Sequence, residues 1–202
     1  MSQDTSVRTT PAKPSMRWRT VDIIVAAVLA VVCGLLFWLW GQIYRGIGDP
    51  VSAFLPGIQG VLGGPWLLAG PLAAIIIRKP GAALFVEMVA ATVSALVGTE
   101  WGPLTLVSGL VQGLGAEIAF AIFAYRRWSI GTAVLAGAFA GVGAAILDNL
   151  MWYIGTDIAF KAIYAVSVIT SGALVAGLGG WLLAHALART GALQRFAISR
   201  HR

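Results

Sequence analysis

The sequence predicts an all-α membrane protein, a six-transmembrane-helix bundle with its N and C termini cytoplasmic. Three observations predict this fold. Of the 202 residues, 58% are hydrophobic and 11% are charged, whereas a soluble domain carries about 25% charged residues. A chain this apolar would expose large hydrophobic surfaces to water, which indicates that its solvent is a lipid bilayer. The other two observations are a series of long apolar segments and the placement of the basic residues between them.

The chain begins with a polar, basic segment. Residues 1–20 contain Pro11 and Pro14 among several Ser and Thr residues, so we expect a disordered cytoplasmic tail. The first apolar segment, Val21–Ile43, would extend roughly 34 Å as a helix, enough to cross the hydrocarbon core. It has no obvious small-residue cleavage site, so we do not expect a secretory signal peptide.

Five further apolar segments follow the first. The connections between them carry charges or the turn-forming residues Gly and Pro. The third segment is the shortest, and Glu87 lowers its hydropathy. The transmembrane domain is therefore predicted over residues 21–187, followed by a basic cytoplasmic tail over 188–202. The five predicted spans lie near Gly57–Ile77, Ala82–Gly98, Pro103–Tyr125, Gly131–Tyr153 and Phe160–Ala186.

The basic residues predict the orientation in the membrane. With six spans, twelve Lys and Arg residues lie on the side of the two termini, and only Arg45 and Lys161 lie on the other side. Cytoplasmic segments carry the excess of basic residues in most membrane proteins, so both termini are predicted in the cytoplasm. Because the net charge of +6 is distributed in this way, it does not indicate a nucleic-acid partner.

Carboxylates within the apolar spans are the strongest functional signal. An ionisable side chain at mid-bilayer costs roughly 2.5–3.5 kcal/mol, so it is rarely placed there without a role. Glu87, Glu117 and Asp148 lie in the third, fourth and fifth spans, and no Lys or Arg lies mid-span to pair with them. Two interpretations stay open: protonated acids bonded between helices, or a cavity for a ligand with donors or a positive charge.

Depth in the membrane predicts which residues would form a site open to the outside. Aromatic rings beside carboxylates suit a flat cationic ring. The residues expected first, apart from Glu87, are Gln112, Glu117, Asp148, Asn149, Trp152 and Tyr153. Five others could close the site, although packing or the interfacial aromatic belt is the favoured interpretation of each; they are Trp38, Gln42, Gln59, Trp66 and Tyr164.

Several classes of site are absent from the sequence. There is no G-x-x-x-x-G-K-[ST] phosphate loop, and the only histidines, His185 and His201, cannot form an H-E-x-x-H zinc site. The single cysteine, Cys33, excludes an internal disulfide. No serine–histidine pair is plausible within the bilayer. We therefore expect neither an enzyme nor a bound cofactor or metal.

Three stretches resemble the YkoE family. They are Ile75–Ala83 with its Arg-Lys-Pro-Gly turn, Ser108–Glu117 with Val-Gln-Gly-Leu-Gly-Ala-Glu, and Leu187–Leu193, and the resemblance extends over about residues 18–197. Members are substrate-binding S components of energy-coupling factor (ECF) transporters, associated with thiamine and its hydroxymethylpyrimidine precursor. The resemblance implies a subunit that binds the vitamin from outside, while a transmembrane coupling protein and two ATPase subunits supply the energy.

The resemblance also implies roles for particular residues. Glu87 or Glu117 would accept hydrogen bonds from the aminopyrimidine, and residues Tyr44–Pro56 would form a lid loop after the first helix. Small residues every four positions on that helix either pack within the bundle or dock a partner, and the family favours docking on the coupling protein; they are Ala26, Ala30 and Gly34. The expected location is the plasma membrane of a bacterium.

Two other classes of function remain as alternatives. The first is a self-sufficient secondary transporter, proton-coupled through Glu117, although six helices without an internal repeat would then need a dimer. The second is a membrane-embedded enzyme or scaffold, which the lack of a nucleophile–base pair disfavours. Thiamine, hydroxymethylpyrimidine and related aminopyrimidines also stay open as substrates.

Overall fold

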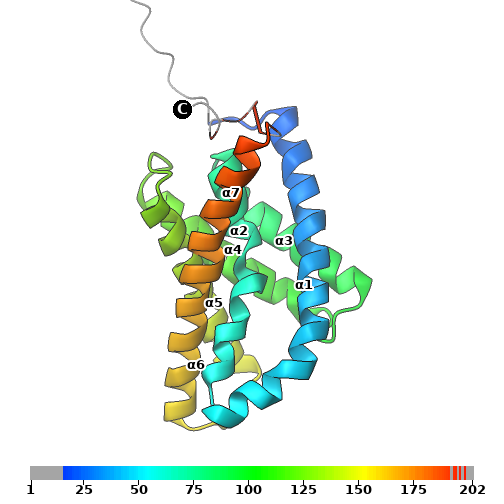
Figure 1. The fold of residues 1–202 in the computed structure, drawn as a ribbon, viewed down its shortest axis with the longest axis vertical. Coiled ribbons are helices and arrows are strands. Elements are labelled where there is room, and N and C mark those ends of the chain that lie inside the picture. The colour runs from blue at the N-terminus through cyan, green and yellow to red at the C-terminus, as the bar shows by residue number, and fades with distance from the viewer. Residues whose placement is uncertain (1–15, 192, 195, 197, 199–202) are drawn as a thin grey trace, which may run out of the picture.

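The computed structural model describes residues 16–191 together with 193, 194, 196 and 198. Within this part of the chain every regular element is a helix, and Figure 1 shows them as an elongated bundle in which α1 begins and α7 ends at the same end. A 3₁₀-helix, η1, leads into α2, and a π-helix, η2, joins α6 to α7. The elements are α1 (Thr20–Phe54), η1 (Ile58–Leu67), α2 (Ala69–Ile77), α3 (Ala82–Val97), α4 (Leu104–Ile122), α5 (Ile130–Met151), α6 (Ile158–Ser171), η2 (Gly172–Gly179) and α7 (Gly180–Arg189).

The helices account for the six predicted membrane passes. Five are long and apolar enough to cross a bilayer: α1, η1 with α2, α4, α5, and the continuous α6–η2–α7. The sixth is α3, an apolar helix of 16 residues, which agrees with the short third span. The predicted bundle is therefore confirmed, while the cytoplasmic position of the termini stays a prediction.

The two predicted tails are only partly described. Residues 1–15 of the N-terminal tail lie outside the described residues, as do 192, 195, 197 and 199–202 of the C-terminal tail. Among the described tail residues, Leu193, Phe196 and Ile198 are buried. The guanidinium of Arg19, before α1, lies 5.8 Å from the centre of the Phe196 ring. The two ends of the described chain therefore meet at one end of the bundle, which is called its inner end because the termini are predicted to be cytoplasmic.

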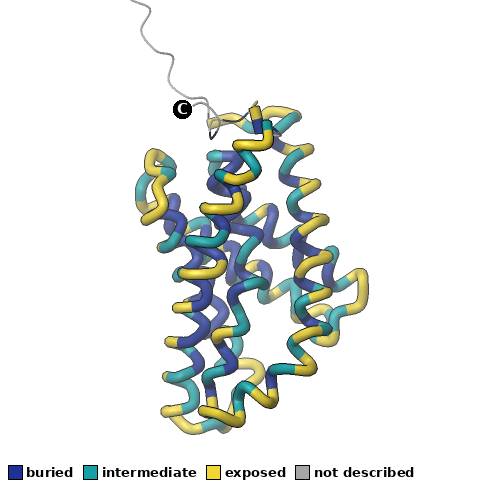
Figure 2. Tube along the Cα trace, viewed as in Figure 1, coloured by how far each residue is buried: buried dark blue, intermediate teal, exposed yellow. Residues whose placement is uncertain are grey.

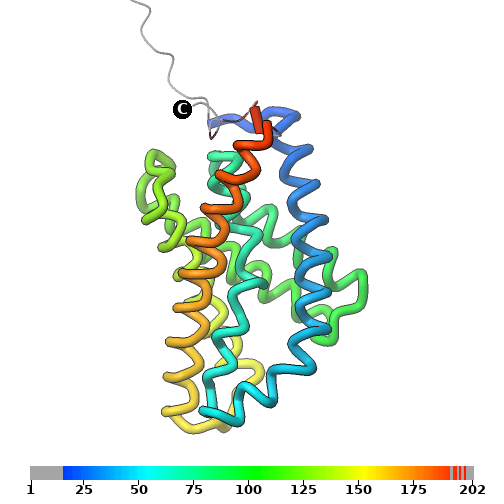
Figure 3. Tube along the Cα trace, in the orientation of Figure 1, coloured from blue at the N-terminus to red at the C-terminus, as the bar shows by residue number. Residues whose placement is uncertain are grey.

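The first helix is longer than the sequence predicts. Residues Tyr44–Pro56, expected as a lid loop, continue α1 as far as Phe54 with Pro50 inside the helix. Figure 3 shows the end of α1 turning across the end of the bundle that lies away from the termini. Tyr44 packs on Trp66 and Trp101, with ring centroids 5.3 and 6.2 Å apart. Gly48 accommodates this ring within the helix, since an added Cβ would lie 3.1 Å from the Tyr44 ring, so it serves packing and not a turn.

The small-residue face of α1 lies inside the bundle. Ala26 and Ala30 are fully buried, and Gly34 is buried against α3, where an added Cβ would lie 2.7 Å from the carbonyl oxygen of Ala90. Small residues permit such close approach of two helices in a membrane. The expected docking surface is thereby corrected: in this conformation Ala26, Ala30 and Gly34 form an internal contact.

The core is densest around α2. All nine residues of α2 are buried, and Figure 2 shows buried segments along the middle of the bundle with exposed ones at its periphery. Since α2 follows η1, it occupies the half of its membrane pass nearer the termini. The other half of that pass, η1, carries three glycines and Trp66.

Candidate functional site

A cavity of about 210 Å³ lies within the bundle. Each pass contributes residues from its half away from the chain termini or from its middle, such as Tyr44 late in α1 and Tyr164 early in α6. The cavity is therefore predicted to face the outer side of the membrane. Its polar lining forms two groups, one on α3 and α4 around Glu87 and one on α5 and α6 around Asp148.

Glu87 is the most deeply buried charged residue of the cavity, with 1% of its surface exposed. Its Oε2 accepts the backbone N–H of Gly70 on α2 at 2.6 Å. Its Oε1 has no hydrogen-bond partner among the described residues. Leaving a buried polar atom unpaired costs about 1–3 kcal/mol, so this oxygen is a candidate acceptor for a ligand donor.

Two glycines of α4 allow this arrangement. An added Cβ at Gly113 would lie 3.1 Å from the Cβ of Glu87, and one at Gly109 would lie 2.5 Å from the Cβ of Ala91 on α3. Larger side chains at either position would separate α4 from α3. The glycine pair thus brings the polar residues of α4 close to Glu87.

Further polar side chains surround Glu87. Gln112 and Ser94 are buried and line the cavity together with Thr105 and Ser108. The hydroxyl of Thr105 also has no partner within the described part of the chain. This side of the cavity can therefore accept and donate several hydrogen bonds to a polar ligand.

The second polar group contains Asp148. The hydroxyl of Tyr164 donates to Oδ2 of Asp148 at 2.5 Å. The Tyr153 ring lies 4.7 Å from that of Tyr164, and its hydroxyl interacts with Gln59 and Tyr44. The group places a carboxylate beside two aromatic rings.

An aromatic cluster closes the cavity between α1, η1 and the connection from α3 to α4. The rings of Tyr44, Trp66 and Trp101 lie 5.1–6.2 Å apart. Trp66 is fixed by a hydrogen bond from its Nε1 to the carbonyl of Phe37 at 3.0 Å. Gly41 leaves room for Trp101, since an added Cβ would lie 3.1 Å from its ring. Such rings offer faces to a flat or cationic ligand.

Eight of the twelve residues predicted to bind substrate line the cavity. The structure brings together residues from η1, α3, α4, α5 and α6 that are up to 105 positions apart (Tyr164 against Gln59). The eight residues are Gln59, Trp66, Glu87, Gln112, Asp148, Trp152, Tyr153 and Tyr164.

Glu117 lies outside the cavity, at the inner end of α4. Its carboxylate accepts backbone N–H groups from Gly81 at 2.6 Å, Ala83 at 3.0 Å and Leu84 at 3.2 Å. These are the first amides of α3, which have no partner within their own helix. Glu117 therefore caps α3 from a neighbouring helix.

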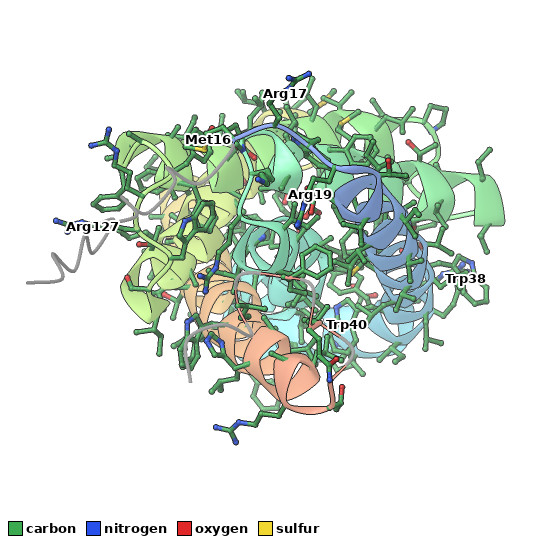
Figure 4. All side chains as sticks on the ribbon, turned by 90° about the horizontal axis from the view of Figure 1, so that it is seen from above. Met16, Arg17, Arg19, Trp38, Trp40 and Arg127 are labelled. Carbon is green, nitrogen blue, oxygen red and sulfur yellow. The ribbon has the colours of Figure 1, made fainter. Side chains whose placement is uncertain are left out.

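The other three predicted residues also do not line the cavity. The side-chain amide of Asn149 donates to the carbonyl of Ala145 at 2.8 Å, within α5. Gln42 accepts a hydrogen bond from Arg45 at 2.9 Å on the exposed side of α1. Figure 4 shows Trp38 at the periphery of the bundle. Helical spacing explains these positions, because neighbouring residues on a helix face different directions.

The structure adds cavity residues that the sequence did not single out. Ser94 follows Glu87 by seven positions on α3, and Thr105 and Ser108 precede Gln112 by seven and four positions on α4. Residues four and seven apart share a helix face, so this spacing could have identified them. Tyr44 was expected in a lid loop and Trp101 was not assigned to the site, although both rings line the cavity.

Comparisons with known proteins agree with this architecture. Over residues 21–143 the sequence matches the family described as "ABC-type cobalt transport system, permease component". The chain is 36% identical over 187 residues, or 91% of each chain, to the protein named "Putative HMP/thiamine permease protein YkoE" of Bacillus subtilis (strain 168). In the portion described by the structure, no three His, Cys, Asp or Glu side chains gather as ligands for a metal ion.

A solved structure extends the similarity to the fold. It is described as the crystal structure of an S-component of an ECF transporter, with a TM-score of 0.84 and 33% identity, covering 91% of this chain and 92% of that chain. The fold, the membrane passes and the sequence agree along nearly the whole length. The protein is therefore a multi-pass transport protein and not an enzyme. The chain belongs to the YkoE family of ECF transporter S components.

Proposed function

We propose that this chain binds thiamine or its hydroxymethylpyrimidine precursor from outside the bacterial plasma membrane. A YkoE relative is named for both compounds. The observation that carries the proposal is the buried Glu87, whose Oε1 has no partner among the described residues and which lines an aromatic-walled cavity. Binding would supply the hydrogen-bond donor that this oxygen lacks.

The chemistry of the two groups of residues supports this substrate class. An aminopyrimidine presents N–H donors in the plane of a flat ring, so Glu87 can accept from it while Gln112 donates and accepts beside it. The faces of Trp66 and Trp101 suit the ring, and Asp148 suits a positive charge such as the thiazolium of thiamine. Glu117 has no part in this scheme, since its carboxylate is occupied by the amides of α3.

We further propose that delivery depends on partner subunits. S components act with an ECF module, and this sequence contains no phosphate-binding loop of its own. A transmembrane coupling protein and two ATPase subunits would convert ATP hydrolysis into movement of the loaded subunit. The cavity would then open to the cytoplasm.

Binding and uptake measurements test the proposal. The purified full chain in detergent or nanodiscs should bind thiamine or hydroxymethylpyrimidine by calorimetry, and the Glu87→Gln variant should bind far more weakly. Cells expressing the chain alone should show little uptake, and co-expression of the three partner subunits should restore ATP-dependent uptake. Efficient uptake by the chain alone, driven by a proton gradient, would favour the secondary transporter.

A further inference from the structure

The 3₁₀-helix η1 positions one wall of the cavity. It extends over ten residues, whereas runs longer than about 3–4 residues are uncommon for this helix type. Gln59, Gly63, Trp66 and Leu67 of η1 line the cavity. Because a 3₁₀-helix rises about 2.0 Å per residue against about 1.5 Å for an α-helix, its winding sets where these side chains lie.

Glycines bring η1 against the backbone of α6. Residues three apart share a face of a 3₁₀-helix, and Gly57, Gly60 and Gly63 follow this spacing. An added Cβ would lie 2.6 Å from the carbonyl oxygen of Phe160 at Gly57 and 2.7 Å from that of Tyr164 at Gly60. The contact leaves no room for side chains, so side chains of α6 itself must supply any polar bond between the two helices.

Ser171, the last residue of α6, supplies such bonds. Its Oγ accepts the backbone N–H of Gly64 at 3.0 Å and donates to the backbone carbonyl of Val61 at 2.5 Å. Val61 and Gly64 are three residues apart, so their C=O and N–H groups are the pair that defines a 3₁₀ turn. One hydroxyl therefore binds both ends of a single turn, two residues before Trp66.

The neighbouring residues hold Ser171 in place. Gly172, where the π-helix begins, packs on α5 so closely that an added Cβ would lie 2.4 Å from the carbonyl oxygen of Gly137. The same Cβ would lie 3.0 Å from Leu67 of η1. Ser171 is buried but is not among the residues that line the cavity. It contacts the cavity wall from behind.

We propose that Ser171 is a positioning residue of the substrate site: by bonding Val61 and Gly64 it fixes the turn of η1 that places Gln59 and Trp66 in the cavity. This inference rests on the proposed function, because it concerns affinity for that substrate. Ser171 acts through η1 and does not touch the ligand.

An isosteric pair of variants tests the role of the hydroxyl. Thr and Val have the same shape, so Ser171→Thr and Ser171→Val crowd the site equally, and only Thr keeps the hydroxyl. The Thr variant should bind thiamine or hydroxymethylpyrimidine about tenfold more tightly than the Val variant, as expected for one or two lost hydrogen bonds.

Ser167→Ala is the matched control, since Ser167 is buried one turn earlier on α6 and its hydroxyl makes no hydrogen bond in the described part of the chain. It should bind within about twofold of the unaltered chain, because the substitution removes no specific interaction.

Hydrogen exchange separates positioning from general destabilisation. Amides of η1 should exchange faster in Ser171→Val than in Ser171→Thr, while those of α2 exchange equally in both. Equal affinity and equal η1 exchange in the two variants would overturn the proposal, as would a loss of affinity in Ser167→Ala as large as that in Ser171→Val. If the unaltered chain binds neither compound, the proposed function fails, and the exchange difference still tests whether Ser171 fixes η1.

Discussion

Acidic side chains have different partners in the half of the bundle that holds the cavity, here the outer half, and in the half that holds the chain termini, here the inner half. Glu87 in the cavity accepts one backbone N–H and leaves its Oε1 without a partner among the described residues. Glu117 at the inner end accepts three backbone N–H groups at 2.6–3.2 Å. Both look alike in sequence, since each is a lone glutamate in an apolar span. Their hydrogen-bond partners separate a candidate ligand acceptor from a structural cap.

The same contrast holds for the aspartates. Asp22 near the inner end is fully buried but paired with Arg19, with an N–O distance of 2.7 Å. Asp148 at the cavity is bonded to the hydroxyl of Tyr164, a neutral partner that leaves its charge uncompensated. The inner half is thus closed by satisfied polar contacts, whereas the outer half retains groups that a ligand can complete. This difference supports the proposal that the outer half binds substrate.

The largest expected effect is that of Glu87→Gln on substrate affinity. The amide oxygen of Gln can still accept from Gly70, but an NH2 group takes the place of Oε1 and cannot accept from a ligand donor, and an unpaired buried polar group costs about 1–3 kcal/mol. Affinity for thiamine or hydroxymethylpyrimidine should therefore fall about 5- to 150-fold, with little change in melting temperature. Calorimetry on the purified variant measures this. Unchanged affinity would remove Glu87 from the site and with it the contrast with Glu117.

Glu117→Gln should show the opposite pattern. It weakens the cap on the first amides of α3, and loss of a helix cap costs about 0.5–2 kcal/mol of stability. The melting temperature should fall, while affinity measured at a temperature where the variant is folded should change less than in Glu87→Gln. Thermal unfolding monitored by tryptophan fluorescence, paired with calorimetry, provides both values. A large loss of affinity at unchanged stability would show that Glu117 contributes to the ligand site.

Tyr164→Phe tests the second polar group. The variant keeps the ring and removes the hydroxyl that donates to Asp148. Loss of one such bond costs about 0.5–1.5 kcal/mol, so affinity should fall roughly two- to tenfold. If Asp148 faces the thiazolium, thiamine should be affected more than hydroxymethylpyrimidine, which competition binding can compare. Equal effects on both compounds would show that Asp148 does not recognise the positive charge.

The sequence was sufficient to predict the fold for physical reasons. Each pass except the third is a long apolar segment between charges or turn residues, and these local signals directly reflect the lipid solvent. The end of α1 was not predicted, because the packing of Tyr44 against Trp66 and Trp101 depends on residues far apart in the sequence. Turn preferences of Gly46 and Pro50 carry no information on that contact.

The site could be predicted only in part for the same reason. Ionisable residues in apolar spans pointed to Glu87 and Asp148, but depth along a helix does not specify direction around it. Asn149 is adjacent to Asp148 in sequence and Trp152 follows Asp148 by four positions, yet only Trp152 lines the cavity with it. The capping role of Glu117 could not be predicted, because only the tertiary structure brings the amide of Gly81, at the start of α3, against its carboxylate. Likewise, only the packing on α3 decided that the small residues of α1 are internal.

The smallest expected effect concerns the outer rim of the cavity. Arg45, late in α1, and Glu100, in the connection before α4, form an ion pair at 3.3 Å, with side chains 52% and 34% exposed. Exposed pairs contribute about 0.2–1 kcal/mol, so Arg45→Gln and Glu100→Gln should each speed substrate dissociation by less than about fivefold. The double variant should match Arg45→Gln, because Glu100 has no partner left in the pair once Arg45 is replaced; Arg45→Gln itself also loses the bond to Gln42. Stopped-flow fluorescence at low and high salt measures the dissociation rate, and the difference between the variants and the unaltered chain should shrink as salt screens the pair.

Two outcomes would contradict this prediction: an effect that does not depend on salt, or additive effects of the two substitutions. Either would mean that the pair does not hold the rim closed and that the outer half is held by its aromatic cluster alone.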